Sequence, residues 1–273
     1  MAQLSSGDLV VGSFDGSFKV FNLQGACIRE LQQPQTSDSI LNNKCNAFAV
    51  SQLGDGRVIA CNFMSLRIWE LSSGQCSTWY ITSMAAIITS MAVMPGGRHV
   101  ALATKQVDYA THGCALDIWD VHTRTVLRRL DTKSPPLLQH LNTALVRKSH
   151  SENRSRNNFS CVTPLADGRV VFSLASDIKP SCGVFTVPST GHTGTLSTGF
   201  LGVWDPAKNE CKQLAGPSCD AECCPRCECC PEKVLCPPQN GQPRQGHPLY
   251  MGVVQLADGR VVSCSDEGVR VWL

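Results

Sequence analysis

The stretch Leu165-Ala166-Asp167-Gly168-Arg169-Val170-Val171 decides the fold, because the chain repeats it. It returns as Leu256-Ala257-Asp258-Gly259-Arg260-Val261-Val262 and, with small changes, as Leu53-Gly54-Asp55-Gly56-Arg57-Val58-Ile59. Looser copies are Leu4-Ser5-Ser6-Gly7-Asp8-Leu9-Val10 and Met94-Pro95-Gly96-Gly97-Arg98-His99-Val100. In each copy a tight turn with glycine separates two β-prone stretches, which is the sequence signal of a β-hairpin.

A second phrase follows each copy and contains an aromatic residue, with one β-prone position before it. These phrases are Lys19-Val20-Phe21-Asn22, Arg67-Ile68-Trp69-Glu70, Asp117-Ile118-Trp119-Asp120, Gly202-Val203-Trp204-Asp205 and Arg270-Val271-Trp272-Leu273. A short polar turn comes next, such as 72–75, and then one more β-prone segment, such as 126–130. The unit is therefore four short strands, a to d, and the chain holds it five times.

At this point the sequence resembles the WD-repeat family, over nearly all of its length outside the insertions. In the first unit, Val11 to Asn22 gives the closest match. Asp15 falls on the family's aspartate in the b–c turn, and Phe21-Asn22 falls on its Trp-Asp pair. In the last unit, the number of residues between His247 of the Gly246-His247 pair and Trp272 matches the family's spacing between its Gly-His pair and its tryptophan.

The resemblance implies a structural hydrogen-bond network in the last unit. In the family a histidine, the turn aspartate, a serine or threonine of strand b and the tryptophan form it. The candidates here are His247, Ser263, Asp266 and Trp272. The second unit has Phe63 near the place of the turn aspartate, and only the last unit has a well-placed Gly-His pair. We therefore expect the other blades to depend more on apolar packing.

The sequence predicts an all-β fold: a single β-propeller domain of WD-repeat type over 1–273, with about five four-stranded blades. The units lie at about 1–33, 45–80, 87–130, 159–214 and 247–273. The first begins at strand b and the last stops at the aromatic residue of strand c, so we expect both terminal blades to be incomplete, with open edges. We then expect a fragment, a truncated gene model or an irregular five-bladed ring.

Long insertions interrupt the third and fourth units. Residues 104–115 and 176–198 lengthen the b–c turns, and the insertions 131–158 and 215–246 lengthen the d–a connections. In a propeller, these two kinds of connection leave the same face. Long loops on a rigid scaffold commonly carry binding sites, so this face is the candidate interaction surface. The alternative is that the insertions are disordered segments without a function.

Composition excludes several classes of function. A net charge of +2 gives no field that would attract nucleic acid or an acidic membrane, so we expect neither partner. No apolar run approaches the roughly 20 residues of a membrane span. No secretory signal begins the chain. Nine of the sixteen cysteines are scattered singly, which favours a reducing compartment. We expect a cytoplasmic protein, with the nucleus as the alternative.

The sharpest local signal is a cluster of cysteines in the last insertion. Its members are Cys219, Cys223, Cys224, Cys227, Cys229, Cys230 and Cys236. Cys224 and Cys227, and likewise Cys227 and Cys230, have two residues between them, a spacing that lets two thiolates bind one zinc ion. The run resembles those of metallothioneins. Three interpretations stay open: bound zinc, labile disulfides, and a solvated loop without a ligand.

The sequence carries no catalytic motif: it has no Gly-x-Ser-x-Gly elbow, no Walker phosphate loop and no His-Glu-x-x-His helix. We therefore expect no enzyme, no small-molecule substrate and no certain cofactor, zinc being the one candidate. The function we expect is a non-catalytic scaffold that binds other proteins through one loop-decorated face. The alternative is a metal-binding or redox-responsive module that acts through the Cys-rich insertion 219–236.

Overall fold

The computed structural model describes residues 1–13, 17–31, 49–62, 64–80, 86–106, 114–131, 137, 156–178, 196–215, 250–265 and 268–272. These residues form five antiparallel sheets, each built from strands that are consecutive in the chain. The first two sheets contain β1 (Ala2–Gln3), β2 (Leu9–Gly12), β3 (Phe18–Phe21) and β4 (Cys27–Leu31), then β5 (Ala49–Gln52), β6 (Val58–Cys61), β7 (Ser65–Trp69) and β8 (Cys76–Tyr80).

The remaining three sheets are taller. They contain β9 (Ala86–Val93), β10 (His99–Gln106), β11 (Cys114–Asp120) and β12 (Thr125–Asp131), then β13 (Arg156–Pro164), β14 (Val170–Ile178), β15 (Leu196–Asp205) and β16 (Glu210–Ala215), and finally β17 (Tyr250–Gln255), β18 (Val261–Ser265) and β19 (Gly268–Trp272). Four sheets have four strands and the last has three.

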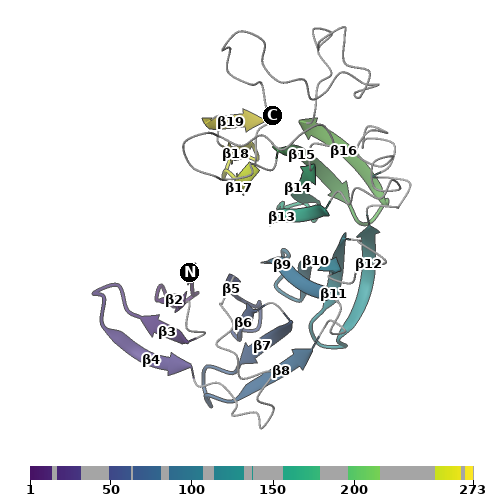
Figure 1. Cartoon of the computed structure of the whole chain (residues 1–273). Coiled ribbons are helices and arrows are strands. Elements are labelled where there is room, and N and C mark those ends of the chain that lie inside the picture. The colour runs from purple at the N-terminus through teal and green to yellow at the C-terminus, as the bar shows by residue number, and fades with distance from the viewer. Residues whose placement is uncertain are drawn as a thin grey trace, which may run out of the picture.

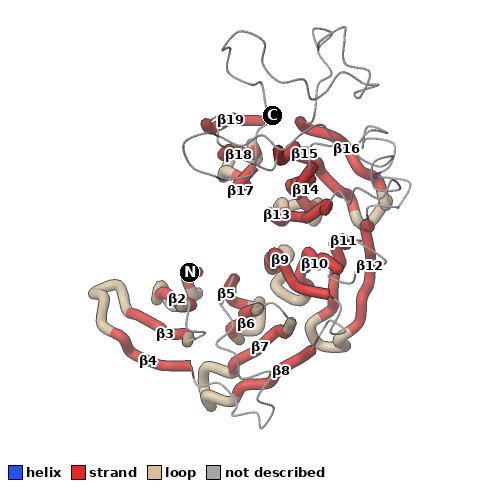
Figure 2. The backbone as a smooth tube through the Cα atoms, in the orientation of Figure 1, coloured by secondary structure: helices blue, strands red, loops and turns tan. Residues whose placement is uncertain are grey.

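The sheets are arranged as the blades of a five-bladed β-propeller. Figure 1 shows them following one another along an arc in chain order, with the first strand of each sheet innermost and the last strand outermost. Figure 2 shows the same backbone as strands joined by turns. The prediction of an all-β propeller with about five blades is confirmed. The first and last sheets are the two ends of the arc in Figure 1.

One detail of the prediction is wrong: the first blade does not begin at strand b. Residues Ala2 and Gln3 form a two-residue strand a, in which Ala2 pairs with Val10 and Gln3 pairs with Leu9. Two residues can form a strand here because the tight turn that follows holds them in register with β2. In this turn the Leu4 amide donates to the Asp8 carbonyl at 2.8 Å. The last blade has strands a to c, as expected.

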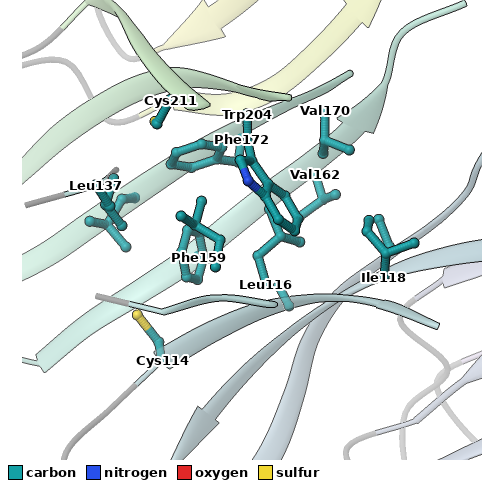
Figure 3. Packing of buried hydrophobic residues seen from close by; sticks show 14 of the residues in the cluster. Cys114, Leu116, Ile118, Leu137, Phe159, Val162, Val170, Phe172, Trp204 and Cys211 are labelled. Atoms are coloured by element: carbon teal, nitrogen blue, oxygen red, sulfur yellow. The ribbon is translucent and has the colours of Figure 1, made fainter. Parts of the chain in front are cut away.

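The hydrophobic core consists of layers between neighbouring sheets. The largest layer lies between the third and fourth sheets, where Phe159, Phe172 and Trp204 gather against Leu116 of β11 (Figure 3). The rings of Phe159 and Phe172 meet edge to face, with centroids 5.3 Å apart. Three further layers join the other neighbouring pairs of sheets. Each blade is therefore buried by its neighbours.

The tryptophans of strand c stand in these layers. Trp69 and Trp204 are fully buried, while Trp119 and Trp272 are partly buried. Trp69 lies against Phe18 of the first sheet, with ring centroids 5.0 Å apart. Each tryptophan thus contacts the preceding blade.

Two glycines let the turns of the second and third blades touch. The Gly54 amide donates to the Gly97 carbonyl at 3.1 Å, so one turn hydrogen-bonds directly to the other. A Cβ atom on Gly54 would lie 2.5 Å from the carbonyl oxygen of Gly96, and a Cβ on Gly97 would overlap the Gly54 amide nitrogen. Gly97 also has a φ of +69°, which side chains rarely adopt. Neither position has room for any other residue.

We predict that Gly97→Ala destabilises the protein more than Gly96→Ala does. Gly96 also has a positive φ, of +83°, but a Cβ there meets nothing within 4 Å. Gly96→Ala should therefore lower the free energy of unfolding by about 1–2 kcal/mol, the cost of holding an alanine in the left-handed conformation. Gly97→Ala adds the collision with the neighbouring turn, and Gly54→Ala isolates that collision, since Gly54 lacks a positive φ. Urea unfolding measures all three. Equal losses at positions 96 and 97 would contradict the turn contact.

Candidate binding surfaces

The a–b turns form one end of the blades. Four of the five share one geometry, and the third, in which the Met94 amide donates to the His99 carbonyl, is one residue longer. In each, the amide of the first turn residue donates across the hairpin, and a second amide, that of Gly7, Gly56, Gly97, Gly168 or Gly259, donates back to the carbonyl of that first residue. In three turns the aspartate forms a hydrogen-bonded ion pair with the arginine two residues on: Asp55–Arg57, Asp167–Arg169 and Asp258–Arg260. The hydrogen bond from the arginine side chain lowers the pKa of each aspartate. The repeated Asp-Gly-Arg phrase is therefore explained by the turn.

An open pocket of about 580 Å³ lies at this end of the first three blades. The lining residues are uncharged: Gln3, Leu4, Ser5, Ser51, Gln52, Leu53, Gly54, Val93, Met94, Gly96 and Gly97. The Ser5 amide donates to Gln52 Oε1 at 2.6 Å, which joins two of its walls. Hydroxyl, amide and backbone groups on an apolar floor can hydrogen-bond a peptide or another polar chain.

The opposite end of the blades carries the long connections. In the second sheet the b–c ladder ends at the pair Cys61 and Leu66. In the fourth sheet the ladder runs from Val170 opposite Trp204 to Ile178 opposite Leu196, so it extends much further toward the b–c end. The third sheet is also extended, to Lys105 opposite Cys114. The two insertions predicted in b–c turns, 104–115 and 176–198, begin and end on these extended strands, so their first and last residues belong to the ladders and not to the turns.

Residues at the Trp-Asp position cap the c–d turns. Asp120 Oδ1 accepts hydrogen bonds from the amides of His122 and Thr123, at 2.8 and 3.0 Å. Asp205 Oδ1 accepts from Ala207 and Lys208 in the same way, and the Asn22 amide oxygen accepts from Gln24 and Ala26. These residues satisfy backbone donors that the turn leaves without a partner. In these turns their role is structural.

Two members of the predicted network, Ser263 and Trp272, are placed by the structure. The indole N–H of Trp272 donates to Ser263 Oγ at 2.8 Å, as the resemblance implied. His247 and Asp266 lie outside the described residues, as does Asp15. In the fourth blade, Phe172 stands where the last blade has Ser263, and among the described residues nothing accepts from the buried Trp204 N–H. The fourth blade thus relies on apolar packing, as expected.

The second blade has a polar b–c turn that sequence reasoning missed. The prediction concentrated on Phe63, but the buried Asn62 serves this turn. Its side-chain oxygen accepts from the amides of Met64 and Ser65, at 3.0 and 2.7 Å, and from Ser65 Oγ at 2.9 Å. The signal was present, because an asparagine followed three residues later by a serine is typical of a side-chain-capped turn.

The seven cysteines proposed as zinc ligands, from Cys219 to Cys236, all lie outside the described residues. Within the described ranges, no group of three or more histidine, cysteine, aspartate or glutamate residues is placed to hold a metal ion. Burial raises the pKa of Cys61 and of Cys211 to about 12, so these thiols stay protonated and pack as small apolar groups. Where the structure is described, no helix has the length and apolar character needed to span a membrane.

We predict that Ser263 and Trp272 are energetically coupled. Ser263→Ala leaves the indole N–H without its partner, and Trp272→Phe removes the donor. A double-mutant cycle on unfolding free energies should give a coupling of about 0.5–1.5 kcal/mol, the usual net value of such a bond. The cycle of Ser263→Ala with Trp204→Phe is the control, because Trp204 does not bond Ser263. A coupling of zero in the first cycle would mean that the hydrogen bond contributes nothing.

We predict a loss of stability in acid that depends on Asp120. The amide of Thr123, then Arg98 and the His122 amide, lower the pKa of this nearly buried carboxylate to about 2. Because the native pKa lies below the unfolded one, the stabilisation is complete above about pH 4 and is lost as the pH falls toward 2. Asp120→Asn should flatten the pH dependence of unfolding in this range. A slope as steep as that of the parent would contradict this assignment.

Comparisons with known proteins bear on the fold. No family model matches the chain, and no curated protein matches it. Among solved structures it is similar to Kuenenia stuttgartiensis hydrazine synthase, with a TM-score of 0.61, 12% identity, and coverage of 99% of this chain and 62% of that one. It is also similar to the extracellular domain of a protein assigned as a one-component system in B. thetaiotaomicron (TM-score 0.54, 11% identity, 99% and 26% covered). This chain spans less than two thirds of either structure, and the likeness shows the β-propeller fold alone.

Proposed function

We propose that this chain is a non-catalytic scaffold that binds other proteins through the face from which its b–c turns and d–a connections leave. The observation that carries the proposal is the unequal height of the sheets. The b–c ladder of the fourth sheet extends to Ile178 opposite Leu196, while that of the second ends at Cys61 opposite Leu66.

The antiparallel topology puts these extended ends together. Strand a runs toward the a–b turn and strand b runs back, so the b–c turn and the d–a connection share the other end of every sheet. The a–b turns are short throughout: 4–8, 53–57, 94–98, 165–169 and 256–260. The connections 107–113, 132–155, 179–195 and 216–249 all leave from the extended third and fourth sheets or enter the sheet after them. Additional sequence has thus accumulated at one end.

The strands beneath this face are rigidly held. Val170, Phe172 and Leu174 of β14 are buried in the layers beside the fourth sheet, and Leu116 of β11 is buried opposite them. The strands from which these connections leave are therefore fixed by packing. Recognition by loops on a rigid β scaffold is a recurrent mode of protein binding.

The test is a capture experiment with the whole chain as bait and two matched variants. In one variant, residues 179–195 are replaced by a short Gly/Ser turn that joins β14 to β15. In the other, Ser5→Arg fills the uncharged pocket at the opposite end of the blades. Proteins retained by the parent, identified by mass spectrometry, should fall at least tenfold with the loop variant and stay unchanged with Ser5→Arg.

Two outcomes would contradict the proposal. If Ser5→Arg loses the captured proteins and the loop variant keeps them, the binding site lies at the a–b end. The second outcome is that the loop variant still retains every captured protein, and that the variants in which 107–113, 132–155 and 216–249 are shortened do so too. Binding would then not depend on this face. Circular dichroism of each variant confirms that the sheets are retained.

A further inference from the structure

The layers between blades are built from two different faces. The face that a sheet turns toward the following sheet carries the residue before the strand-c aromatic, and in the fourth sheet it presents Val171, Leu201 and Val203. The face turned toward the preceding sheet carries the aromatic residue itself, and in the fourth sheet it presents Val170, Phe172 and Trp204. We call the face turned toward the following sheet the leading face and the face turned toward the preceding sheet the trailing face. Every layer thus joins the leading face of one sheet to the trailing face of the next.

A polar contact accompanies this packing at two of the joints. The Ser5 amide donates to Gln52 Oε1 at 2.6 Å, and the Ala166 amide donates to Gln255 Oε1 at 2.8 Å. In both, the donor lies in the a–b turn of one blade and the glutamine ends strand a of the following blade. The glutamine Nε2 is engaged in its own turn, where Gln52 donates to Gly56 and Gln255 donates to Gly259.

The last sheet presents a leading face that no sheet of the described chain covers. The pairing of Val262 with Val271 repeats that of Val171 with Val203, and the pairing of Cys264 with Val269 repeats that of Ser173 with Leu201. Val171 is fully buried and Val203 is 8% exposed, whereas Val271 is 53% and Val269 71% exposed.

The first sheet presents the matching trailing face. Leu9 pairs with Phe21 as Val170 pairs with Trp204, and Val11 holds the position of Phe172. Leu9, Val11 and Phe21 are only partly buried, whereas the three equivalent residues of the fourth sheet are fully buried.

The first and last sheets also carry the donor and the acceptor of the polar contact between blades. Gln3 is the first blade's equivalent of Gln52 and Gln255, and its Nε2 donates to Gly7 in the same way. Its Oε1 accepts from no described residue, and Ala257, the last blade's equivalent of Ala166, donates its amide to none.

We propose that the leading face of the last sheet binds the trailing face of the first sheet of a second copy of this chain. Val262, Val269 and Val271 of one copy pack against Leu9, Val11 and Phe21 of the other, and the Ala257 amide donates to Gln3 Oε1. The interface continues the series of layers already present between the blades. A second copy is the occupant because each chain carries both halves of this joint, on sheets that stand at opposite ends of the arc (Figure 1).

The contact is heterologous, since two different faces meet head to tail. An open assembly of any number of copies therefore keeps one unused leading face and one unused trailing face, at its two ends. The size of the assembly then depends on protein concentration, and the two faces can be disabled separately.

Sedimentation velocity of the whole chain in reducing buffer tests the proposal. The parent should show an average mass that rises above 29.5 kDa with concentration. Val271→Asp removes the leading face and Val11→Asp removes the trailing face, so each variant alone should stay at 29.5 kDa. An equimolar mixture of the two should form a species of twice that mass, because each variant retains the half that the other lacks.

Two further variants complete the test. Leu127→Asp alters an equally apolar side chain, 41% exposed on the outer strand β12, and should leave self-association unchanged. Gln3→Ala, at an exposed position where misfolding is not expected, should weaken self-association about 2- to 10-fold, the effect of one hydrogen bond. A parent that stays at 29.5 kDa at every concentration overturns the proposal. So does a parent that associates while the mixture of the two folded face variants does not.

Discussion

Apolar packing between neighbouring sheets is the interaction on which the rest of this structure depends. Short strands need a packed hydrophobic face to form a stable sheet in water, and here the sheets of the first two blades have strands of two to five residues. Their stability comes from layers such as that of Phe159, Phe172 and Trp204 against Leu116. Each internal blade is apolar on both faces, so it is completed only when both neighbours are in place.

Polar groups in this propeller serve the turns more than the layers. Asp120, Asp205 and Asn22 accept hydrogen bonds from the amides of c–d turns, and Asn62 does the same for a b–c turn. Within the layers, Trp272 donates a hydrogen bond to Ser263. The Trp204 N–H, in a different layer, has no acceptor among the described residues. Packing of the large ring compensates for the donor that stays unsatisfied, because burying an indole contributes more than one hydrogen bond does.

The two ends of the blades are suited to different tasks. Short turns at the a–b end contact one another, and the direct bond between Gly54 and Gly97 leaves no room for side chains between them. At the b–c end the fourth sheet extends its ladder to Ile178 opposite Leu196. A blade can therefore change at one end while the contacts that align it with its neighbours are preserved at the other. That separation is compatible with the proposed scaffold role.

The sequence by itself determined the local structure. The Asp-Gly-Arg phrase predicted three a–b hairpins, and its two looser copies predicted the others. The phrase before each aromatic residue predicted strand c, because turn geometry and strand periodicity depend on residues close together in the chain. Tertiary structure decided what distant residues do. Strand a at Ala2–Gln3 is too short to be recognised by periodicity, and it exists because a partner strand is held beside it. The glycine requirement at Gly54 likewise follows from a turn about forty residues away, which only the packing of two blades brings into contact.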